Sequence, residues 1–184
     1  MQRQEAINLL EENLKNRNLI KHCLAVEAAM IALARHFSED GEQWALCGLL
    51  HDIDYEKTKD NPTEHSKIGA EMLREKGIDS EICDAVLTHN EIHGIEPQTL
   101  MAKAVYCLDP LTGLIVAATL VLPTKKLNDL SAESVLKRFK EPAFARGANR
   151  EIIKKCKTLL DTNLEEFVRI TLQAMQSIVS ELGL

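Results

Sequence analysis

The sequence lacks several features that would place it in a specialised class of proteins. No apolar run is long enough to cross a membrane as a helix, and the N-terminus has neither the apolar core nor the cleavage site of a secretion signal. The five cysteines form no C-x-x-C pair, and their odd number suits a reducing compartment better than a disulfide framework. These absences predict a cytoplasmic protein with no membrane partner.

Positive charge is also scarce. The net charge is -6, so the chain as a whole does not attract phosphate backbones, and we expect no nucleic acid polymer as a partner. One segment departs from this balance, because residues 125–157 contain ten Lys and Arg against four Asp and Glu. This basic segment is either a solvated surface or a source of cations for a small phosphorylated substrate, and Lys137 and Arg146 are our candidates for substrate contacts.

The pattern of apolar residues is helical almost throughout. A chain of 184 residues with 45 % hydrophobic residues suits one globular domain. Residues 55–64 are polar and predict a loop, and residues 111–122, apolar on nearly all sides, predict a buried helix although periodicity alone does not exclude a strand. The other expected helices cover residues 5–15, 19–36, 42–51, 65–76, 80–89, 99–109, 131–140, 149–160 and 164–182.

The sequence therefore predicts an all-α fold in a single domain over residues 1–184. Its core is expected at about residues 20–122, with residues 123–184 as C-terminal helices that pack on it. The last of these helices has a long apolar face that must be buried against other helices. Its start at residues 162–165 resembles a capping box with Thr162 as the cap.

A histidine and an aspartate adjoin at the end of an apolar run, at His51 and Asp52. Alone, such a pair would more often be a helix cap or a surface hydrogen bond. Further histidines and an aspartate occur at other expected helices, and together they suggest a metal-ligand set. This set is His22, His51, Asp52, His65, His89 and Asp109. Its spacing is too wide for a local zinc finger.

The order of these residues resembles that of the HD superfamily of metal-dependent phosphohydrolases. Residues 47–54 (CGLLHDID) look like the core signature of that superfamily, and residues 109–114 (DPLTGL) look like its closing aspartate segment. The resemblance covers about residues 20–122 and implies a helical bundle of the HD-domain type. It also implies hydrolysis of a phosphate ester.

The resemblance implies a role for each candidate ligand. His22, His51, Asp52 and Asp109 would hold one metal, while His65 and His89 would hold a second metal that Asp52 bridges. Histidine and carboxylate ligands suit Mn, Fe, Ni, Co or Zn, as one or two divalent ions. Asp52 and Asp54 are the candidate catalytic residues, and Asp54 or Glu64 could accept a hydrogen bond from a ligating histidine.

Some residues fall outside this pattern. His36 and His93 have no position in it and are expected at the surface, although His93 lies four residues after His89 and could pair with it on a continuous helix. Cys47 is expected to be a core thiol. The sequence also lacks the Gly-Tyr-Pro motif of members that hydrolyse cyclic dinucleotides, and it has Asp54 and Tyr55 where those members have Gly and Lys. A cyclic dinucleotide is therefore not expected as the substrate.

The leading hypothesis is a phosphomonoesterase or phosphodiesterase that acts on a small, nucleotide-like phosphate ester. Two alternatives remain open. Some proteins similar to the two-metal branch activate oxygen, so a diiron oxygenase has the same ligand list. A non-catalytic regulatory module with a structural metal is the other. The sequence does not specify the substrate, the metal or the oligomeric state.

Overall fold

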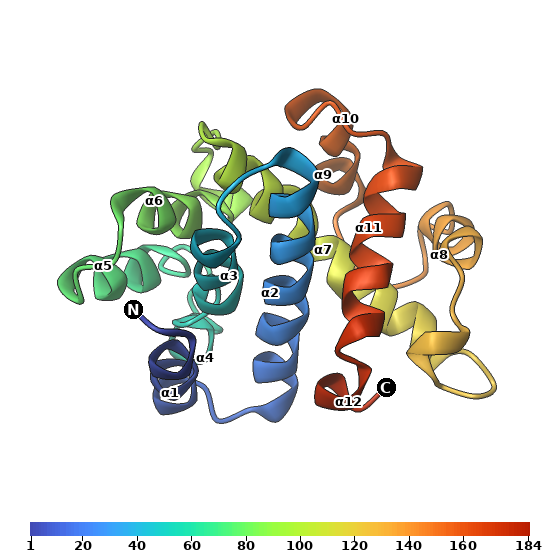
Figure 1. Ribbon diagram of the computed structural model, residues 1–184, viewed down its shortest axis with the longest axis horizontal. Helices are drawn as coiled ribbons and strands as arrows, with labels where there is room; N and C mark the ends of the chain where they lie inside the picture. Colours follow the sequence, from blue (N-terminus) through green and yellow to red (C-terminus); the bar gives the residue numbers. More distant parts are fainter.

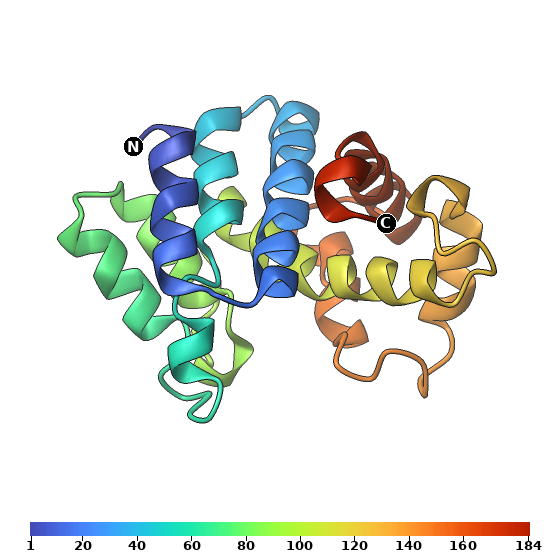
Figure 2. The same cartoon turned by 90° about the horizontal axis from the view of Figure 1, so that it is seen from below.

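Two long helices cross in the middle of the molecule, and shorter helices pack on either side of them. The computed structural model describes all residues, 1–184, as helices and connecting loops without strands. Figure 1 shows α2 and α7 in the centre, with α1 and α3–α6 to one side and α8, α11 and α12 to the other. The same division is seen from below in Figure 2. The predicted all-α class is confirmed.

The α-helices have the following bounds in chain order: α1 (Arg3–Asn13), α2 (Arg17–Phe37), α3 (Gly41–Leu50), α4 (Tyr55–Thr58), α5 (Lys67–Glu75), α6 (Ser80–Thr88), α7 (Leu100–Leu120), α8 (Ala132–Phe139), α9 (Arg150–Lys154), α10 (Cys156–Leu159), α11 (Leu164–Ser177) and α12 (Val179–Leu182). Two short 3₁₀ helices, η1 (Glu91–His93) and η2 (Leu127–Asp129), lie in loops.

Helices α2 and α3 pack closely because one glycine permits it. A Cβ atom placed on Gly48 would lie 2.8 Å from Glu27 Cα and 2.9 Å from the Val26 carbonyl oxygen. These are backbone atoms that cannot move aside without shifting α2. The helix that ends beside His51 is therefore held at close range to the helix that carries His22.

Helix α7 corrects our prediction of two helices divided near Pro110. The helix continues from Leu100 to Leu120 with Pro110 inside it. Proline removes one backbone hydrogen bond, but the nearby Leu108 and Leu111 are fully buried, and the helix packs against α2, α6, α8 and α9. Tertiary packing thus holds the helix together across the proline.

The continuous helix α7 is also a longer apolar stretch than the sequence analysis expected. By length and composition alone, α7 is apolar enough to cross a membrane, although the sequence analysis expected no such stretch. Within this fold, 61 % of the most apolar part of α7 is buried inside the structure. Core helices of soluble proteins commonly have the same length and apolar character. The helix also carries Asp109 near its middle.

Several element boundaries differ from our predictions. The expected loop over residues 55–64 contains the short helix α4. Two expected helices are each broken into two pieces, α9 with α10 and α11 with α12. The cap of α11 is Asn163, whose side chain accepts from the Glu166 N–H, so the proposed capping box at Thr162 is wrong.

The C-terminal helices share the hydrophobic core of the N-terminal ones. A single cluster of buried apolar residues extends from Ala6 to Leu182. Phe167 and Met175 on α11 are fully buried, and this helix contacts α2, α7 and α8. The tail therefore packs against the two helices that carry His22 and Asp109.

Candidate metal centre

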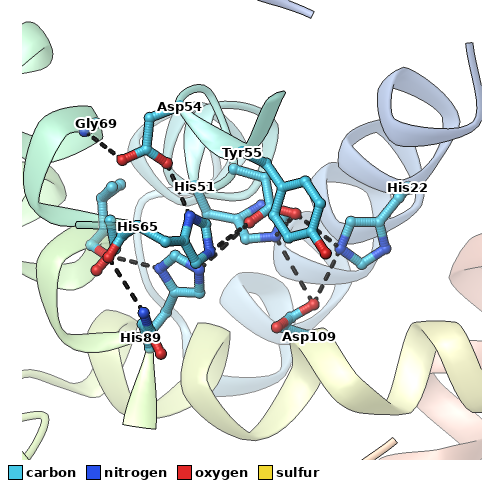
Figure 3. Close-up of polar contacts among 12 residues, drawn as sticks. His22, His51, Asp54, Tyr55, His65, Gly69, His89 and Asp109 are labelled. Atoms are coloured by element: carbon cyan, nitrogen blue, oxygen red, sulfur yellow. Dashed lines mark hydrogen bonds and ion pairs between the residues drawn. The ribbon is translucent and has the colours of Figure 1, made fainter. Parts of the chain in front are cut away.

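The fold brings all six candidate ligands together in one place (Figure 3). They come from five different parts of the chain. His22 lies on α2, and Asp109 lies on α7. His51 and Asp52 follow α3 directly, His89 follows α6, and His65 precedes α5. Our prediction that a helix begins at His65 is wrong, because Ser66 adopts a left-handed conformation (φ 71°) and α5 begins at Lys67.

Each of the four histidines is held by a hydrogen bond from Nδ1. His51 Nδ1 lies 2.8 Å from the Gly48 carbonyl oxygen, and His89 Nδ1 lies 2.6 Å from that of Val86. His65 Nδ1 lies 2.8 Å from Asp54 Oδ1. Carbonyl and carboxylate oxygens only accept, so these three Nδ1 atoms carry the hydrogen.

The fourth histidine has the same arrangement through a hydroxyl group. Thr112 Oγ1 donates to the Asp109 carbonyl oxygen at 2.9 Å and lies 3.2 Å from His22 Nδ1. Because its hydrogen is already used, the hydroxyl oxygen accepts from His22. In its neutral form, each of the four imidazoles thus directs an Nε2 lone pair into the centre, where the other groups are carboxylate oxygens.

Asp52 lies between two groups of histidines and faces each with a different oxygen. Its Oδ2 is 3.6 Å from both His22 Nε2 and His51 Nε2. Its Oδ1 is 3.2 Å from His65 Nε2 and 3.4 Å from His89 Nε2. Asp109 Oδ1 belongs to the first group, at 2.9 Å from His22 Nε2. The geometry therefore offers two neighbouring ligand groups that share one carboxylate.

The donor set fits a divalent metal ion. His51 Nε2 is completely buried and has no hydrogen-bond partner, an arrangement that is costly for a polar atom. Four lone pairs and two carboxylates without a cation among them would repel each other. Imidazole and carboxylate groups are the usual ligands of Zn, Mn, Fe, Co and Ni. The residues of this cluster meet the requirement for such an ion.

When no metal ion is bound, protons on the histidines balance the carboxylate charges. Burial lowers the pKa of His51, but the charges of Asp52 and Asp109 outweigh burial and raise this pKa to about 9. Burial likewise lowers the pKa of His65, and the hydrogen bonds to Asp52 and Asp54 raise it to about 10. Burial opposes ionisation of Asp109, yet His22 and His51 hold its pKa well below the usual range. The centre thus has a strong preference for bound positive charge.

Asp54 is fully buried, and both of its carboxylate oxygens are occupied. Oδ1 accepts from His65, and Oδ2 accepts from the Gly69 N–H at 2.7 Å (Figure 3). We predicted Asp54 both as a catalytic residue and as an acceptor for a ligating histidine. The structure shows it as that acceptor, whereas Glu64, the other candidate, is exposed. No oxygen of Asp54 is left to reach a substrate.

His93 has a structural position that we did not predict. Instead of lying at the surface, it directs Nε2 to the His65 carbonyl oxygen at 2.7 Å and to Ser66 Oγ at 3.0 Å. Asn90 Nδ2 donates to the same carbonyl at 3.1 Å. The helix ends at Thr88, so His93 does not stack on His89 as a second ligand. His36 is exposed, as expected.

A cavity of about 340 Å³ opens beside the ligand cluster. His22, His89 and Asp109 form one side of it, and Ala145, Gly147, Ala148, Asn149 and Ile152 form another. Tyr106 also lines this cavity, one helical turn before Asp109, and its hydroxyl oxygen lies 3.3 Å from Lys155 Nζ. The sequence analysis did not identify Tyr106, although its spacing from Asp109 places both on one helix face.

Tyr55, the first residue of α4, lies against the cluster. Its ring meets that of His65 edge to face, with ring centres 5.2 Å apart, and it is 39 % exposed (Figure 3). The side chain is thus free to contact a molecule that enters the centre. Only its position directly after the aspartates could have indicated this role.

The two predicted substrate-binding cations lie in different places. Lys137 lines a separate cavity at the far end of α7, with Ala118 and Leu122, and the structure does not bring it beside the ligand cluster. Arg146 lies in the segment that borders the site, and it lines an adjoining cavity rather than the first one. The basic segment is therefore divided, and only part of it approaches the ligands.

The sequence is similar to several known proteins. An uncharacterized protein of Methanocaldococcus jannaschii is 38 % identical over 87 residues, which are 45 % of this chain and 50 % of that protein. The ribonuclease Y of Rhodopirellula baltica is 34 % identical over 145 residues, and that of Thermotoga petrophila is 33 % identical over 144 residues. Both matches cover 74 % of this chain and about a quarter of the relative.

The chain thus spans only a quarter to a half of the length of these relatives. No solved structure matches it. The HD domain family matches residues 19–114, a range that begins just before His22 and ends just after Asp109. All six candidate ligands lie within the matched range. This chain belongs to the HD domain family.

Proposed function

We propose that this protein is a phosphohydrolase that cleaves a small, nucleotide-like phosphate ester with two divalent transition-metal ions. Membership of the HD domain family supports a metal-dependent phosphohydrolase in general. The observation that carries the finer proposal is the convergence of four histidine Nε2 atoms on the shared carboxylate of Asp52.

In this proposal the two groups around Asp52 hold one ion each. His22, His51 and Asp109 with Asp52 would hold the first ion, and His65 and His89 with Asp52 would hold the second. His51 also lies close to Asp52 and His89, so the two groups adjoin. Bound ions of this kind activate a water molecule near neutral pH and withdraw charge from a phosphoryl oxygen. Asp54 is then a positioning residue, because it fixes the tautomer and orientation of His65.

The residues around the cavity orient the substrate. Lys155 has only donors, so its ammonium group donates to the Tyr106 hydroxyl oxygen. The Tyr106 O–H is therefore free to donate to an oxygen of the substrate in the cavity that it lines. Tyr55, which is partly exposed beside His65, is placed to contact the phosphate end of a bound substrate.

RNA is the competing substrate. Several relatives are named ribonuclease Y, and their similarity covers three quarters of this chain. The net charge of -6 weighs against a long polyanion, because neutralised phosphates supply most of the affinity of nucleic-acid binders. We therefore favour a small ester.

The first test combines metal analysis with a substrate screen. We expect two equivalents of transition metal per chain and metal-dependent release of phosphate from aryl phosphates and mononucleotides. Asp52→Ala should abolish both, while Asp60→Ala, which changes an exposed aspartate of the following loop, should abolish neither. Near-normal activity in Asp52→Ala would contradict the assignment. Tightly bound mixed-valent iron with oxygen uptake would instead indicate an oxygenase.

A further inference from the structure

A second cavity adjoins the one beside the ligand cluster. It has a volume of about 690 Å³ and lies between the end of α8 and the start of α9. The two cavities share the side chains or backbone of Glu91, Gly147, Ala148 and Asn149. A molecule held at the metal centre could therefore extend into the second cavity across this common wall.

Two cations of the second cavity have no partner in the protein. Lys140 and Arg146 are exposed and form no ion pair with a carboxylate. The other two cations are already engaged. Arg150 donates to the carbonyl oxygens of Phe144, Ala145 and Ala148, and Lys154 pairs with Glu151 at 2.8 Å. Only Lys140 and Arg146 are thus available for an anionic ligand.

The wall between the cavities carries a negative charge. Glu91 lines both of them, and its Oε1 accepts a hydrogen bond from Asn149 Nδ2 at 3.2 Å. A phosphate at this position would be repelled. Positive charge lies on either side of it, at the metal centre and at Lys140 with Arg146. The charge pattern therefore favours two phosphate groups separated by a neutral portion of the ligand.

We propose that the second cavity binds a second phosphate of the substrate, carried on the leaving group and separated from the scissile phosphate by a neutral unit such as a nucleoside. This proposal deepens the proposed function and rests on it for the position of the scissile phosphate. The same chemistry occurs in a nucleoside bisphosphate and at the end of an oligonucleotide. Arg146 supplies a planar, two-donor contact and Lys140 a point charge.

The test is a binding measurement on the metal-loaded protein with ligands that it does not hydrolyse at the 5′ position. Calorimetry would compare the 5′-methylenephosphonate analogues of adenosine monophosphate and of adenosine 3′,5′-bisphosphate. We expect the second analogue to bind about tenfold more tightly, which corresponds to about 1.4 kcal/mol. The contiguous analogue α,β-methylene ADP should show a smaller gain, because Glu91 opposes its second phosphate.

Substitutions locate the effect. Arg146→Ala and Lys140→Ala should each reduce the affinity ratio of the two analogues toward one, and Glu91→Gln should increase affinity for the bisphosphate analogue. Lys137→Ala is the matched control, since it removes one positive charge of the same tail from a different cavity. Equal affinity for the two analogues, or an equal loss of the ratio in Lys137→Ala, would overturn the proposal.

Two further comparisons distinguish a small ligand from RNA, and failure of the subsite from failure of the proposed function. A ten-nucleotide RNA with the same 5′ phosphonate should bind no more tightly than the bisphosphate analogue if the substrate is small. Tighter binding of the RNA that still depends on Arg146 would support the same subsite with RNA as its ligand. Because binding is measured without turnover, absence of hydrolysis would contradict the proposed function while leaving the subsite testable.

Discussion

Asp54 Oδ1 lies 2.8 Å from His65 Nδ1, and this hydrogen bond joins a fully buried carboxylate to a histidine outside any helix. The other oxygen of Asp54 accepts from the Gly69 N–H at the start of α5. A Cβ atom on Gly69 would lie only 3.2 Å from this carboxylate, so the glycine permits the close contact. Asp54 thereby fixes His65 relative to α5.

Asp54→Asn should weaken binding of the second metal about 10- to 100-fold and leave the first metal bound. The asparagine oxygen can accept from His65 or from Gly69, and its amide nitrogen would face the other donor. Metal titration followed by elemental analysis measures this, with the exposed Asp60→Asn as the control. Retention of two metals together with a loss of kcat would show that Asp54 has a catalytic role instead.

His65→Ala and His89→Ala should each leave about one metal per chain while the rate falls by orders of magnitude, because the Nε2 atom of each residue lies next to Asp52 Oδ1. His22→Ala should affect the other site, where His22 contacts Asp109. Equilibrium dialysis with a single metal gives the stoichiometry. A parent protein that saturates at one equivalent would contradict the two-site assignment.

Gly48→Ala should lower the free energy of unfolding by about 1–3 kcal/mol, because the new methyl group would overlap backbone atoms of Glu27. The resulting shift of α2 from α3 should also weaken metal binding through His22 and His51. Urea unfolding gives the stability change. Gly41→Ala is the control at the start of the same helix, where nothing lies within 4 Å. Equal stabilities for the two variants would contradict the close approach.

The metal-free protein should lose stability as the pH rises from about 6.5 to 10. The pKa of His51 is raised from 6.5 to about 9, and that of His65 is raised from 6.5 to about 10. The two protonated histidines therefore contribute fully to the free energy of unfolding below pH 6.5, and this contribution is lost as the pH rises through about 9 and 10. Bound metal replaces these protons. The difference in Tm between metal-loaded and chelator-treated protein should therefore widen with pH. A metal-free Tm that stays constant or rises would contradict this.

Local features of the site could be predicted from the sequence because they depend on near neighbours in the chain. The order of the six ligands was visible in the residue types, and Asp54 was one of two candidates for the hydrogen-bond acceptor of a histidine. Such features need only a few residues, and their geometry is fixed by the helix itself.

Other features depend on contacts between distant parts of the chain. Local rules end a helix at Pro110, but burial of α7 against several helices outweighs the lost hydrogen bond. The sequence around Lys137 and Arg146 does not distinguish which of them lies near the site, yet the two residues line different cavities. His93 contacts His65 only because the loop folds back. The sequence by itself determined which groups could bind metal, whereas tertiary packing decided which oxygen of Asp52 each histidine faces and which cations approach the site.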